Sequence, residues 1–484
     1  MKQIQLALLL CLQTSVGFAQ AFSKSPLITG LAYPVAFTQS SDGRIFLTQK
    51  GGFTFPAVDA QVSVYDANGN FLSEFCDLSD SIDCEFERGM LGITLDPGFD
   101  WNHFVYIFYT YDSDPQNGGD ARIRIQRFTE LSNVGIAPAI ICDIDVPDNM
   151  TGAHQGGNIH FRPSDTTHIY VSMGDQDNGG NWSAQTGNPF GKILRISKFP
   201  GDPPPSDNPF YDDGNPATGN CDWIWAYGLR NSFDFCFGPN DSLYATENGA
   251  SAYDELNLIT RGGFYGWPAC EGNFNASTTT PCSAPGAIAP LTTFPFPVPS
   301  LTGILFYTDT VFSAQQNHLV VGDYNHADLT DITLINPPAY NQVSTSVFWI
   351  DESQQYGITC LQQGPQGCIY VMEGGYTTNG GIYRICPDAN SVADNDLNNS
   401  LLVSGANPFT TFTTLTYTLE NATRVHLALY DAAGREVALL MNQEQVPGTH
   451  SVGVDAKKYG LSAGIYICIM QTDQFSQTTQ LIIE

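Results

Sequence analysis

A tight turn followed by a short strand of apolar, aromatic and β-branched residues recurs along most of this chain. Each turn contains the Gly, Pro, Asn or Asp that a sharp reversal requires, and the units lie roughly 50 to 75 residues apart. Such recurrence is typical of radial blades, each packed against two neighbours, although short strands recur in any large β-protein. We therefore predict an all-β fold in which residues 25–386 form a six-bladed β-propeller. The six predicted strands cover residues 44–48, 105–108, 169–172, 243–246, 319–321 and 369–372.

The composition restricts the partners that this chain can bind. The 484 residues include 49 acidic and 19 basic side chains, which give a formal net charge of -30. Nucleic acids and anionic membrane surfaces both attract basic patches, so neither is an expected partner. The acidic balance is compatible with calcium and with neutral or cationic ligands. A soluble extracellular surface would explain the charge equally well.

The first residues have the organisation of an export signal. Lys2 precedes an apolar run over residues 6–12, and residues 17–20 resemble a cleavage region. Residues 1–20 are therefore predicted to be a signal peptide. The apolar run is too short to cross a bilayer and no other segment reaches the required length, so we expect no transmembrane segment.

Export would place the cysteines in an oxidising compartment, where disulfides form. The chain has 12 cysteines, and removal of Cys11 with the signal peptide leaves an odd number, so one thiol must remain unpaired. Short sequence separations favour several bridges, but the sequence alone leaves their connectivity open. The candidate pairs are Cys76 with Cys84, Cys270 with Cys282, Cys360 with Cys368, and Cys221 with Cys236.

The sequence changes in character after residue 386. Residues 387–400 are rich in Asp, Asn and Ser and are predicted to be a linker. Apolar residues alternate through residues 401–484, which predicts a small C-terminal β-sandwich with a hairpin turn at 430–435 and a late strand beginning at 463–466. One strand face is expected to contain Leu415, Tyr417 and Leu419, and another Val425, Leu427 and Leu429.

The stretch most informative about chemistry is residues 152–161, where His154 precedes a pair of glycines. Arg230 follows later, and after it comes an acidic loop over residues 247–258. A proton acceptor, a permanent cation and an acidic loop in this order indicate a site that oxidises an alcohol. The structural alternatives are a satisfied turn histidine and an arginine that forms an ion pair between blades.

Further motifs accompany these two segments, and their order resembles one known family. They lie at residues 31–48, 87–92, 96–99, 191–196, 207–210 and 265–268. As an ordered set they resemble the glucose/sorbosone dehydrogenase family, which includes soluble sugar dehydrogenases that depend on pyrroloquinoline quinone (PQQ). The resemblance covers roughly residues 25–386. It implies a six-bladed fold and a PQQ-dependent oxidation of the anomeric hydroxyl of aldose sugars.

The resemblance also implies roles for individual residues. His154 would act as the general base that takes the proton from the sugar hydroxyl while hydride moves to the quinone, a task that suits an imidazole. Arg230 would lie over the quinone oxygen and stabilise the negative charge that develops there, because a guanidinium keeps its proton. Asn231 would add a donor beside it, and Glu87 would contribute a polar side chain near the cofactor.

Calcium is implied by the resemblance at two places. The backbone carbonyls of Gly249 and Ala250 would hold the ion that ties the quinone in place. Asp254 and Glu255 match an acidic pair near a further calcium ion, with Tyr265 as a carbonyl donor. Calcium accepts such hard oxygen ligands in variable geometry.

The chain departs from the family where the quinone should be held. Glucose-oxidising members bind the three PQQ carboxylates with lysine and arginine side chains, whereas residues 322–328 and 354–358 contain neither. Ala153 and Phe264 also replace an acidic residue and an asparagine of the family pattern. One hypothesis is a secreted sugar dehydrogenase that passes electrons to an external acceptor. The alternatives are a non-catalytic glycan- or protein-binding propeller that has lost the cofactor, and a calcium-dependent propeller lactonase.

Residues 401–484 resemble the C-terminal sorting domain of the type IX secretion system. The matching motifs are residues 407–409, 429–437, 447–450 and 461–466. The similarity implies that the secretion machinery is a partner and that the protein is secreted or held at the cell surface, with this domain cleaved afterwards. A carbohydrate-binding or spacer sandwich is the structural alternative.

Overall fold

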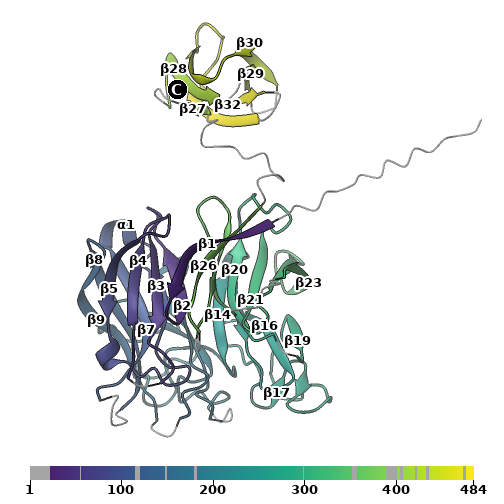
Figure 1. Ribbon diagram of the computed structural model, residues 1–484. Coiled ribbons are helices and arrows are strands. Elements are labelled where there is room, and N and C mark those ends of the chain that lie inside the picture. The colour runs from purple at the N-terminus through teal and green to yellow at the C-terminus, as the bar shows by residue number, and fades with distance from the viewer. Residues whose placement is uncertain are drawn as a thin grey trace, which may run out of the picture. The chain divides into compact units, whose positions relative to one another are not determined.

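The computed structural model describes residues 22–483, apart from 55, 115–119, 148–149, 179–181, 298, 351–356, 376–377, 388–400, 404–406, 420–421, 432–434 and 473–475. Within these residues the chain is built almost entirely of β-strands and divides into two compact units (Figure 1). One unit comprises residues 22–386, and the other contains residues 387–484. The predicted signal peptide, residues 1–20, and nearly all of the predicted linker lie outside the described residues.

The described residues of the first unit form six four-stranded sheets, and a short two-stranded one made of β17 (Cys270–Glu271) and β18 (Phe274–Asn275). The first sheet consists of β2 (Pro34–Gln39), β3 (Ile45–Lys50), β4 (Ala60–Tyr65) and β5 (Phe71–Asp77). The second consists of β6 (Met90–Leu95), β7 (Phe104–Tyr111), β8 (Arg122–Leu131) and β9 (Val134–Asp145). The third consists of β10 (Gly156–Arg162), β11 (Asp165–Met173), β12 (Lys192–Ser197) and β13 (Ile224–Tyr227). The fourth consists of β14 (Ser232–Phe237), β15 (Leu243–Glu247), β16 (Tyr253–Ile259) and β19 (Thr292–Pro295). The fifth consists of β20 (Leu301–Tyr307), β21 (His318–Asp323), β22 (Leu329–Ile335) and β23 (Gln342–Trp349). The sixth consists of β24 (Ile358–Gln363), β25 (Ile369–Glu373), β26 (Gly380–Pro387) and β1 (Phe22–Leu31).

All six strands predicted from the turn-and-strand pattern occur in the structure. They are β3, β7, β11, β15, β21 and β25, and each is the second strand of its sheet. Strands β3 and β15 are buried along their whole length. Aromatic and β-branched side chains suit such central positions, because they pack well on both faces of a pleated sheet. The repeat in the sequence therefore marks an inner strand of each sheet.

The first strands of the six sheets contact one another in cyclic order. Strand β2 contacts β6, and the succession continues through β10, β14, β20 and β24, which returns to β2. Apolar side chains fill the space between neighbouring sheets, where for example Phe75 of the first sheet packs edge-on against Phe128 of the second. The sixth sheet joins both ends of the unit, since β1 pairs beside β26. Loops from different sheets can therefore meet and build one site.

The second unit contains two sheets around one core. One sheet has the order β27-β28-β31 and the other has the order β30-β29-β32-β33. Their strands are β27 (Leu401–Val403), β28 (Phe412–Leu419), β29 (Thr423–Tyr430), β30 (Glu436–Gln445), β31 (Gly448–Asp455), β32 (Gly464–Gln471) and β33 (Ser476–Ile483). The predicted faces are confirmed, because this core contains Leu415, Tyr417, Leu419, Val425, Leu427 and Leu429. The predicted late strand is β32, whereas the centre of the predicted hairpin turn, residues 432–434, lies outside the described residues.

Two disulfides occur among the described residues. Cys270 pairs with Cys282, as predicted, and Cys368 pairs with Cys386. The prediction that Cys360 pairs with Cys368 is wrong because of strand register. Ile369 lies opposite Ile385, so the residues next to them, Cys368 and Cys386, are neighbours across β25 and β26.

The other two predicted bridges are also wrong. Cys76, Cys84, Cys221 and Cys236 are all free thiols. Cys76 lies on β5 within its sheet, whereas Cys84 lies in the segment before β6. Cys221 precedes β13, whereas Cys236 belongs to β14 of the next sheet. Short separation in sequence does not bring these pairs together, because each pair is divided between two elements.

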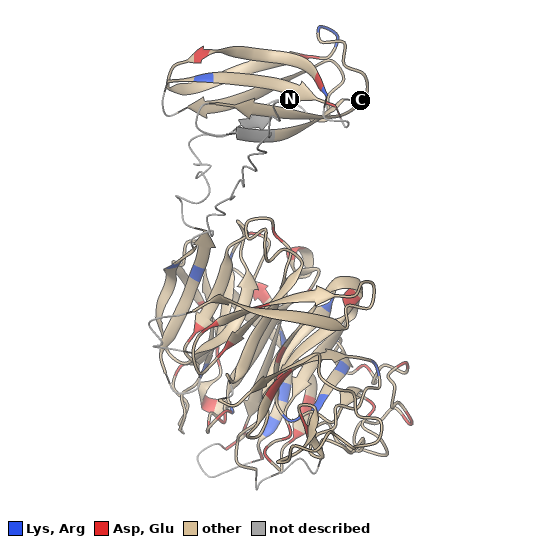
Figure 2. Ribbon diagram, turned by 90° about the vertical axis from the view of Figure 1, so that its right-hand side faces the viewer, with Lys and Arg blue, Asp and Glu red and all other residues tan. Residues whose placement is uncertain are grey.

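Helices are short within the described ranges. They are α1 (Phe99–Asn102) and the 3-10 turns η1 (Ser79–Ser81) and η2 (Pro239–Asp241). None of the described helices has the length and apolar character needed to span a membrane. Figure 2 shows Asp and Glu positions on strands and loops alike, in keeping with 49 acidic residues against 19 basic ones.

Candidate active site

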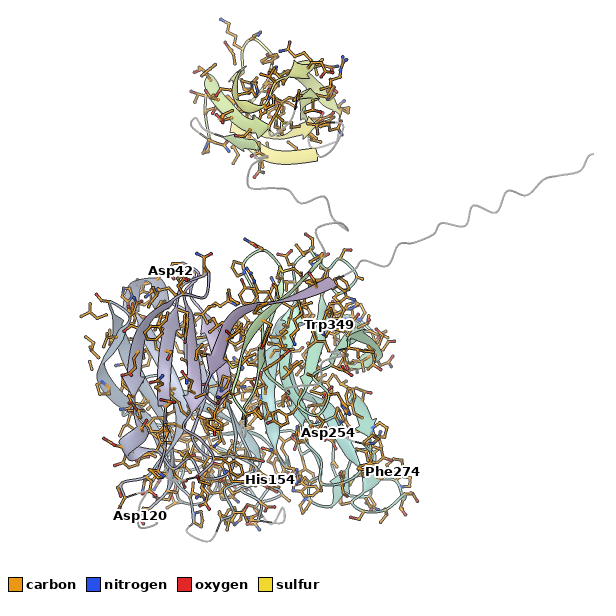
Figure 3. The ribbon with its side chains drawn as sticks, in the orientation of Figure 1. Asp42, Asp120, His154, Asp254, Phe274 and Trp349 are labelled. Carbon is orange, nitrogen blue, oxygen red and sulfur yellow. A yellow bond between two sulfur atoms is a disulfide. The ribbon has the colours of Figure 1, made fainter. Side chains whose placement is uncertain are left out.

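Loops from two neighbouring sheets bring His154 and Arg230 together. His154 lies just before β10, and Arg230 lies between β13 and β14. Figure 3 shows His154 among the loops at the end of the unit that lies opposite Asp42. The backbone of His154 has a left-handed φ of 54°, which is uncommon for residues other than glycine. The backbone N–H of His154 donates a hydrogen bond to Oε2 of Glu87 at 2.6 Å, which helps to hold this strained loop.

The imidazole of His154 has a partner at each ring nitrogen. Nδ1 lies 2.7 Å from Oδ1 of the buried Asp175, and Nε2 lies 2.8 Å from a terminal nitrogen of Arg230. A guanidinium can only donate, so Nε2 must hold the lone pair. The proton of the neutral ring then lies on Nδ1 and faces the carboxylate. The ring is held in the tautomer that a general base requires.

Asp175 is positioned in turn by a tryptophan. The indole Nε1 of Trp267 donates a hydrogen bond to Oδ2 of Asp175 at 2.9 Å. The guanidinium carbon of Arg230 also lies 5.7 Å from the centre of the Trp267 ring, within the range of a cation–π contact. Trp267 therefore contacts both the carboxylate behind the imidazole and the cation beside it.

The guanidinium of Arg230 is held by neutral acceptors. Besides the imidazole, it donates to the backbone carbonyl of Asn248 at 3.0 Å. Its backbone N–H donates to Oε1 of Glu247 at 2.7 Å. Among the described residues the guanidinium forms no ion pair with a carboxylate, so the alternative of an ion pair between sheets does not describe it. Its positive charge is available to a ligand.

Asn231 and Glu87, predicted to lie near a cofactor, both hold the loop that contains His154. Oδ1 of Asn231 accepts the backbone N–H of Gly156 at 2.9 Å, and the Asn231 N–H donates to Glu247 at 2.6 Å. Burial raises the pKa of Glu87, although the nearby His154 and Arg230 favour its ionised form. These two side chains hold the backbone of the His154 loop at two positions, His154 and Gly156.

A small pocket adjoins Arg230, which contributes to its lining. Three glutamates, Glu247, Glu255 and Glu271, contribute to its lining and are only 4%, 8% and 3% exposed. We call this group the carboxylate pocket. Burial, together with the charge of Glu255, raises the pKa of Glu247 to about 8. Burial likewise raises the pKa of Glu255 to about 7, with repulsion from Glu271 and Asp254 adding to the effect.

Two oxygens in and beside the carboxylate pocket lack a hydrogen-bond partner among the described residues. One is Oε2 of Glu271, and the other is Oδ1 of Asn257, whose amide nitrogen donates to Glu255 at 2.9 Å. Buried polar atoms are normally satisfied, so a group with unpaired oxygens is an exception that needs an explanation. Clustered carboxylates with unpaired oxygens are suited to a hard cation such as calcium.

The predicted metal ligands separate into two groups. Gly249, Glu255 and Tyr265 line the carboxylate pocket. Ala250 is exposed and does not line it. Asp254 does not line it either, because its two oxygens accept backbone N–H groups at 3.0 Å from Gly249 and Leu301. Burial raises the pKa of Asp254, and these hydrogen bonds work in the opposite direction.

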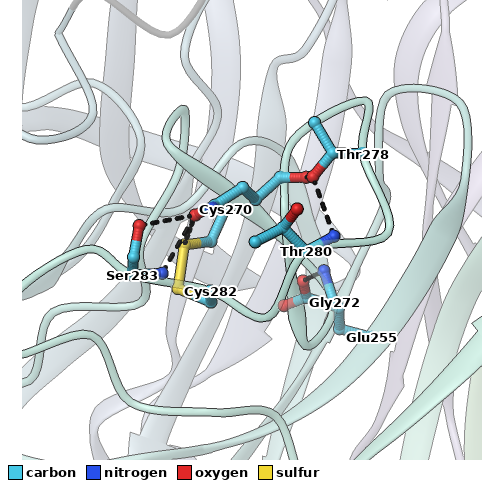
Figure 4. Close-up of a disulfide and its surroundings, with 8 residues drawn as sticks. Glu255, Cys270, Gly272, Thr278, Thr280, Cys282 and Ser283 are labelled. Carbon is cyan, nitrogen blue, oxygen red and sulfur yellow. Dashed lines mark hydrogen bonds between the residues drawn. A yellow bond between two sulfur atoms is a disulfide. The ribbon is translucent and has the colours of Figure 1, made fainter.

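Four residues of this site are not among those predicted from the sequence, namely Asp175, Glu247, Trp267 and Glu271. One signal was available for Glu247, because a hairpin of β15 and β16 places it opposite Glu255. Trp267 lies in a motif that was used only for the family resemblance. Nothing in the local pattern marks Glu271, which lines the pocket and follows Cys270 in the chain. Figure 4 shows the disulfide between Cys270 and Cys282 that closes this loop.

The stretch expected to clamp a quinone is acidic. Asp323 ends β21, and its backbone lies opposite Leu301, which contacts both Asp254 and Asn248. Burial raises the pKa of Asp323 to about 6, although His326 favours its charged form. Asp328 follows in the same turn. Residues 354–356 of the second expected stretch lie outside the described residues.

Comparison with known proteins identifies the larger unit. The family model for glucose/sorbosone dehydrogenase matches residues 31–399. The chain belongs to this family. A second family model, the secretion system C-terminal sorting domain, matches residues 407–484. The glucose/sorbosone dehydrogenase region is therefore followed by a sorting domain, as the sequence motifs predicted.

Relatives and solved structures agree with the assignment to the glucose/sorbosone dehydrogenase family. The aldose sugar dehydrogenase YliI of Escherichia coli is 26% identical over 307 residues, which cover 62% of this chain and 78% of that protein. The soluble aldose sugar dehydrogenase of Escherichia coli in its apo form has a TM-score of 0.64 at 20% identity, over 76% of this chain and 100% of that chain. The PQQ-bound aldose sugar dehydrogenase of Streptomyces coelicolor has a TM-score of 0.57 at 22% identity, over 76% of this chain and 99% of that chain. At these identities the structural similarities support the fold alone.

Proposed function

We propose that this member of the glucose/sorbosone dehydrogenase family is an exported quinoprotein that oxidises the anomeric hydroxyl of aldose sugars and passes electrons to an external acceptor. The six four-stranded sheets are interpreted as the blades of a closed six-bladed propeller over residues 25–386. Residues 1–20 would be the signal peptide, 387–400 the linker and 401–484 a β-sandwich sorting domain.

The observation that supports this function best is the contact between His154 and Arg230. A sugar hydroxyl that enters beside Nε2 would give its proton to the imidazole, and Asp175 would stabilise the imidazolium that forms. Arg230 would stabilise the negative charge that develops on the quinone oxygen. When bound, PQQ would supply the acceptor for the hydride.

The residues present fit the reactive end of PQQ. Arg230 offers a guanidinium that has no carboxylate partner among the described residues, which suits a quinone oxygen. Asn231 and Glu87 would border the cofactor on the side of the His154 loop. One guanidinium does not balance three cofactor carboxylates, and Asp323 and Asp328 stand where glucose-oxidising members have basic residues. A divalent cation beside Arg230 would supply the missing positive charge.

The residues present also fit calcium. Glu247 and Glu255 would provide carboxylate oxygens, and the carbonyls of Gly249 and Tyr265, which line the same pocket, would complete that ligand set. The exposed Ala250 would offer its carbonyl, beside that of Gly249, to the separate ion that ties the quinone in place. Asp254 would act indirectly, because its hydrogen bond to Gly249 fixes the loop that presents these carbonyls. The charge of the ion would relieve the repulsion among the buried carboxylates.

Titration of the purified protein with PQQ and calcium tests this function. Binding should shift the quinone absorbance, and the loaded protein should reduce a redox dye when an aldose is added. His154→Ala should bind PQQ and calcium but lose dye reduction, because the proton acceptor is gone. Normal sugar oxidation by this variant would remove His154 from the mechanism.

One observation favours a second function, a propeller that binds a glycan or protein and has lost the cofactor. That observation is the presence of Asp323 and Asp328 at the expected clamp. A binding propeller would show no quinone absorbance shift and no dye reduction, and it would retain glycan or protein binding without PQQ. The same titration therefore separates the two functions.

Export is proposed to use the type IX secretion machinery, with the domain of residues 401–484 as its recognition element. The match of residues 407–484 to a secretion-system sorting domain supports this route. The protein would then be secreted or held at the cell surface. Deletion of residues 401–484 should trap the protein inside the cell, which fractionation of culture and cells would measure.

A further inference from the structure

We propose that Glu271 is an additional carboxylate ligand of the cation in the carboxylate pocket, and that the Cys270–Cys282 disulfide holds it there. The inference rests on the proposed cation site, but it concerns residues outside the set predicted from the sequence. It also predicts that the affinity for the cation depends on an intact bridge.

The first argument comes from the two carboxylate oxygens of Glu271, which have different surroundings. Oε1 accepts three backbone N–H groups, from Ser251 at 2.9 Å, Ala252 at 2.8 Å and Tyr253 at 3.2 Å. Oε2 is buried without a hydrogen-bond partner among the described residues. Three donors fix the direction of the carboxylate, and the remaining oxygen belongs to a side chain that lines the pocket. An unpaired buried oxygen on a charged group is costly unless a cation or another donor meets it.

The second argument comes from the charge of the pocket. Its lining includes the three glutamates of the carboxylate pocket and one basic residue, Arg230. When all are ionised, three negative charges and one positive charge leave two negative charges, which one divalent cation balances. The ligand atoms are carboxylate and carbonyl oxygens, so a hard ion such as calcium is expected in preference to a softer metal.

The third argument concerns the segment that presents Glu271. Cys270 and Glu271 both line the pocket. The N–H of the next residue, Gly272, donates a hydrogen bond to Oε1 of Glu255 at 2.6 Å. The segment belongs to the two-residue pairing of β17 with β18. A pairing of that size is not stable by itself in water. The Cys270–Cys282 bridge closes the loop covalently (Figure 4).

An aromatic contact connects the same loop to the chain segment that holds Glu271. Phe274 stacks on Tyr253 with ring centres 5.5 Å apart, and the Tyr253 N–H is one of the three donors to Glu271. The bridge, the stacked rings and the three hydrogen bonds thus act on one small region. Loss of the bridge should loosen this region and with it the position of Oε2.

Calcium binding by the full chain, measured by isothermal titration calorimetry without PQQ or sugar, tests the inference. Glu271→Gln should weaken binding by roughly 10- to 100-fold, because a charged ligand becomes a neutral one. Asp59→Asn, which removes one exposed negative charge elsewhere, should change the affinity by less than about twofold. Glu271→Asp keeps the charge but shortens the side chain, so its affinity for calcium should lie between those of the wild type and Glu271→Gln.

The role of the bridge needs its own matched pair. The double variant Cys270→Ser with Cys282→Ser should weaken calcium binding several-fold, whereas Cys368→Ser with Cys386→Ser removes the other bridge and should not. Reduction of the wild type by a dithiol, which becomes a cyclic disulfide as the bridge takes up two electrons and two protons, should reproduce the first result. Circular dichroism confirms that each variant is folded.

Two results would overturn the inference: wild-type protein that binds no calcium, or Glu271→Gln that binds it as tightly as the wild type. The second result leaves the proposed sugar oxidation intact, since that function requires His154 and Arg230 and not Glu271. Conversely, a protein that binds calcium through Glu271 but oxidises no sugar would contradict the proposed function and support this inference.

Discussion

Nε2 of His154 lies 2.8 Å from a guanidinium nitrogen of Arg230, although the two residues are 76 positions apart in the sequence. The contact selects the tautomer of the ring that has its lone pair on Nε2, because the guanidinium donates and cannot accept. It also places a permanent positive charge beside the atom that would take a substrate proton. The base and the residue that would stabilise negative charge therefore already lie side by side, which is what a preorganised site requires.

Asp175→Asn should lower kcat for aldose oxidation by at least about 100-fold. An asparagine amide can donate to Nδ1, which would move the ring proton to Nε2 and remove the lone pair that accepts the substrate proton. Steady-state dye reduction measures the rate, and ¹⁵N NMR of the imidazole reports the tautomer. Asp331→Asn is a matched control, because Asp331 lies 2.7 Å from Nδ1 of His318 in a different sheet. Unchanged kcat in Asp175→Asn would exclude this role.

Trp267→Phe should lower kcat by about tenfold and leave the KM for the sugar within about twofold. The substitution keeps an aromatic ring beside Arg230 but removes the N–H that orients Asp175. Trp101→Phe is the control, because Trp101 is 77% exposed and lies on α1, outside the loops that form the site. If Trp267→Phe raised KM strongly and left kcat unchanged, the tryptophan would serve sugar binding instead of the orientation of the carboxylate.

The sequence predicts the strands of the fold well, because the signal is local. Turn residues followed by buried aromatic and β-branched residues define strands such as β3 and β15 without knowledge of their neighbours. The proximity of His154 and Arg230 was predicted in a different way, from the order of motifs shared with a family. Neither residue has a local pattern that shows its partner, since the contact arises from the packing of two sheets.

The features that the sequence did not reveal depend on register and on loop geometry. Cys368 pairs with Cys386 because of the alignment of β25 with β26, which no local pattern determines. Asp254 resembles a metal ligand in sequence, yet both of its oxygens bind backbone N–H groups. The reverse holds for Glu271, which does not resemble a metal ligand in sequence, yet its side chain lines the pocket.

Calcium should stabilise the protein against unfolding. At a free concentration a hundredfold above its Kd, the ion should raise the free energy of unfolding by about 2.7 kcal/mol, and a chelator should reverse the gain. The reason is that Glu247, Glu255 and Glu271 are buried close together. Thermal unfolding followed by circular dichroism measures the effect. Glu247→Gln should reduce the gain, whereas a melting temperature insensitive to both calcium and chelator would contradict a cation site.

The contacts of Asp165 predict one part of the dependence of stability on pH. Burial alone would raise the pKa of Asp165, but hydrogen bonds from His168 and Thr167 and the charge of Arg195 outweigh it and hold the pKa well below its usual range. The stabilisation is therefore complete above the unfolded-state pKa of about 3.9 and is lost as the pH falls through the lower folded-state pKa.

Asp165→Asn should accordingly lower the free energy of unfolding by roughly 1 kcal/mol at pH 7, a value limited by partial solvent exposure. The difference from the wild type should persist down to about pH 5 and then shrink in more acidic solution. Urea unfolding at several pH values measures it. A difference that grew on acidification would show that the carboxylate does not contribute through its charge.

The most direct test of the account is the rate of dye reduction by the calcium- and PQQ-loaded protein with an aldose, compared between wild type and His154→Ala. Wild-type protein should reduce the dye only when sugar, quinone and calcium are all present. The variant should bind both cofactors and show a rate lower by about 10²- to 10⁴-fold. Equal rates in the two proteins, or no quinone binding by a folded wild type, would contradict the assignment of His154 and Arg230 as a redox site.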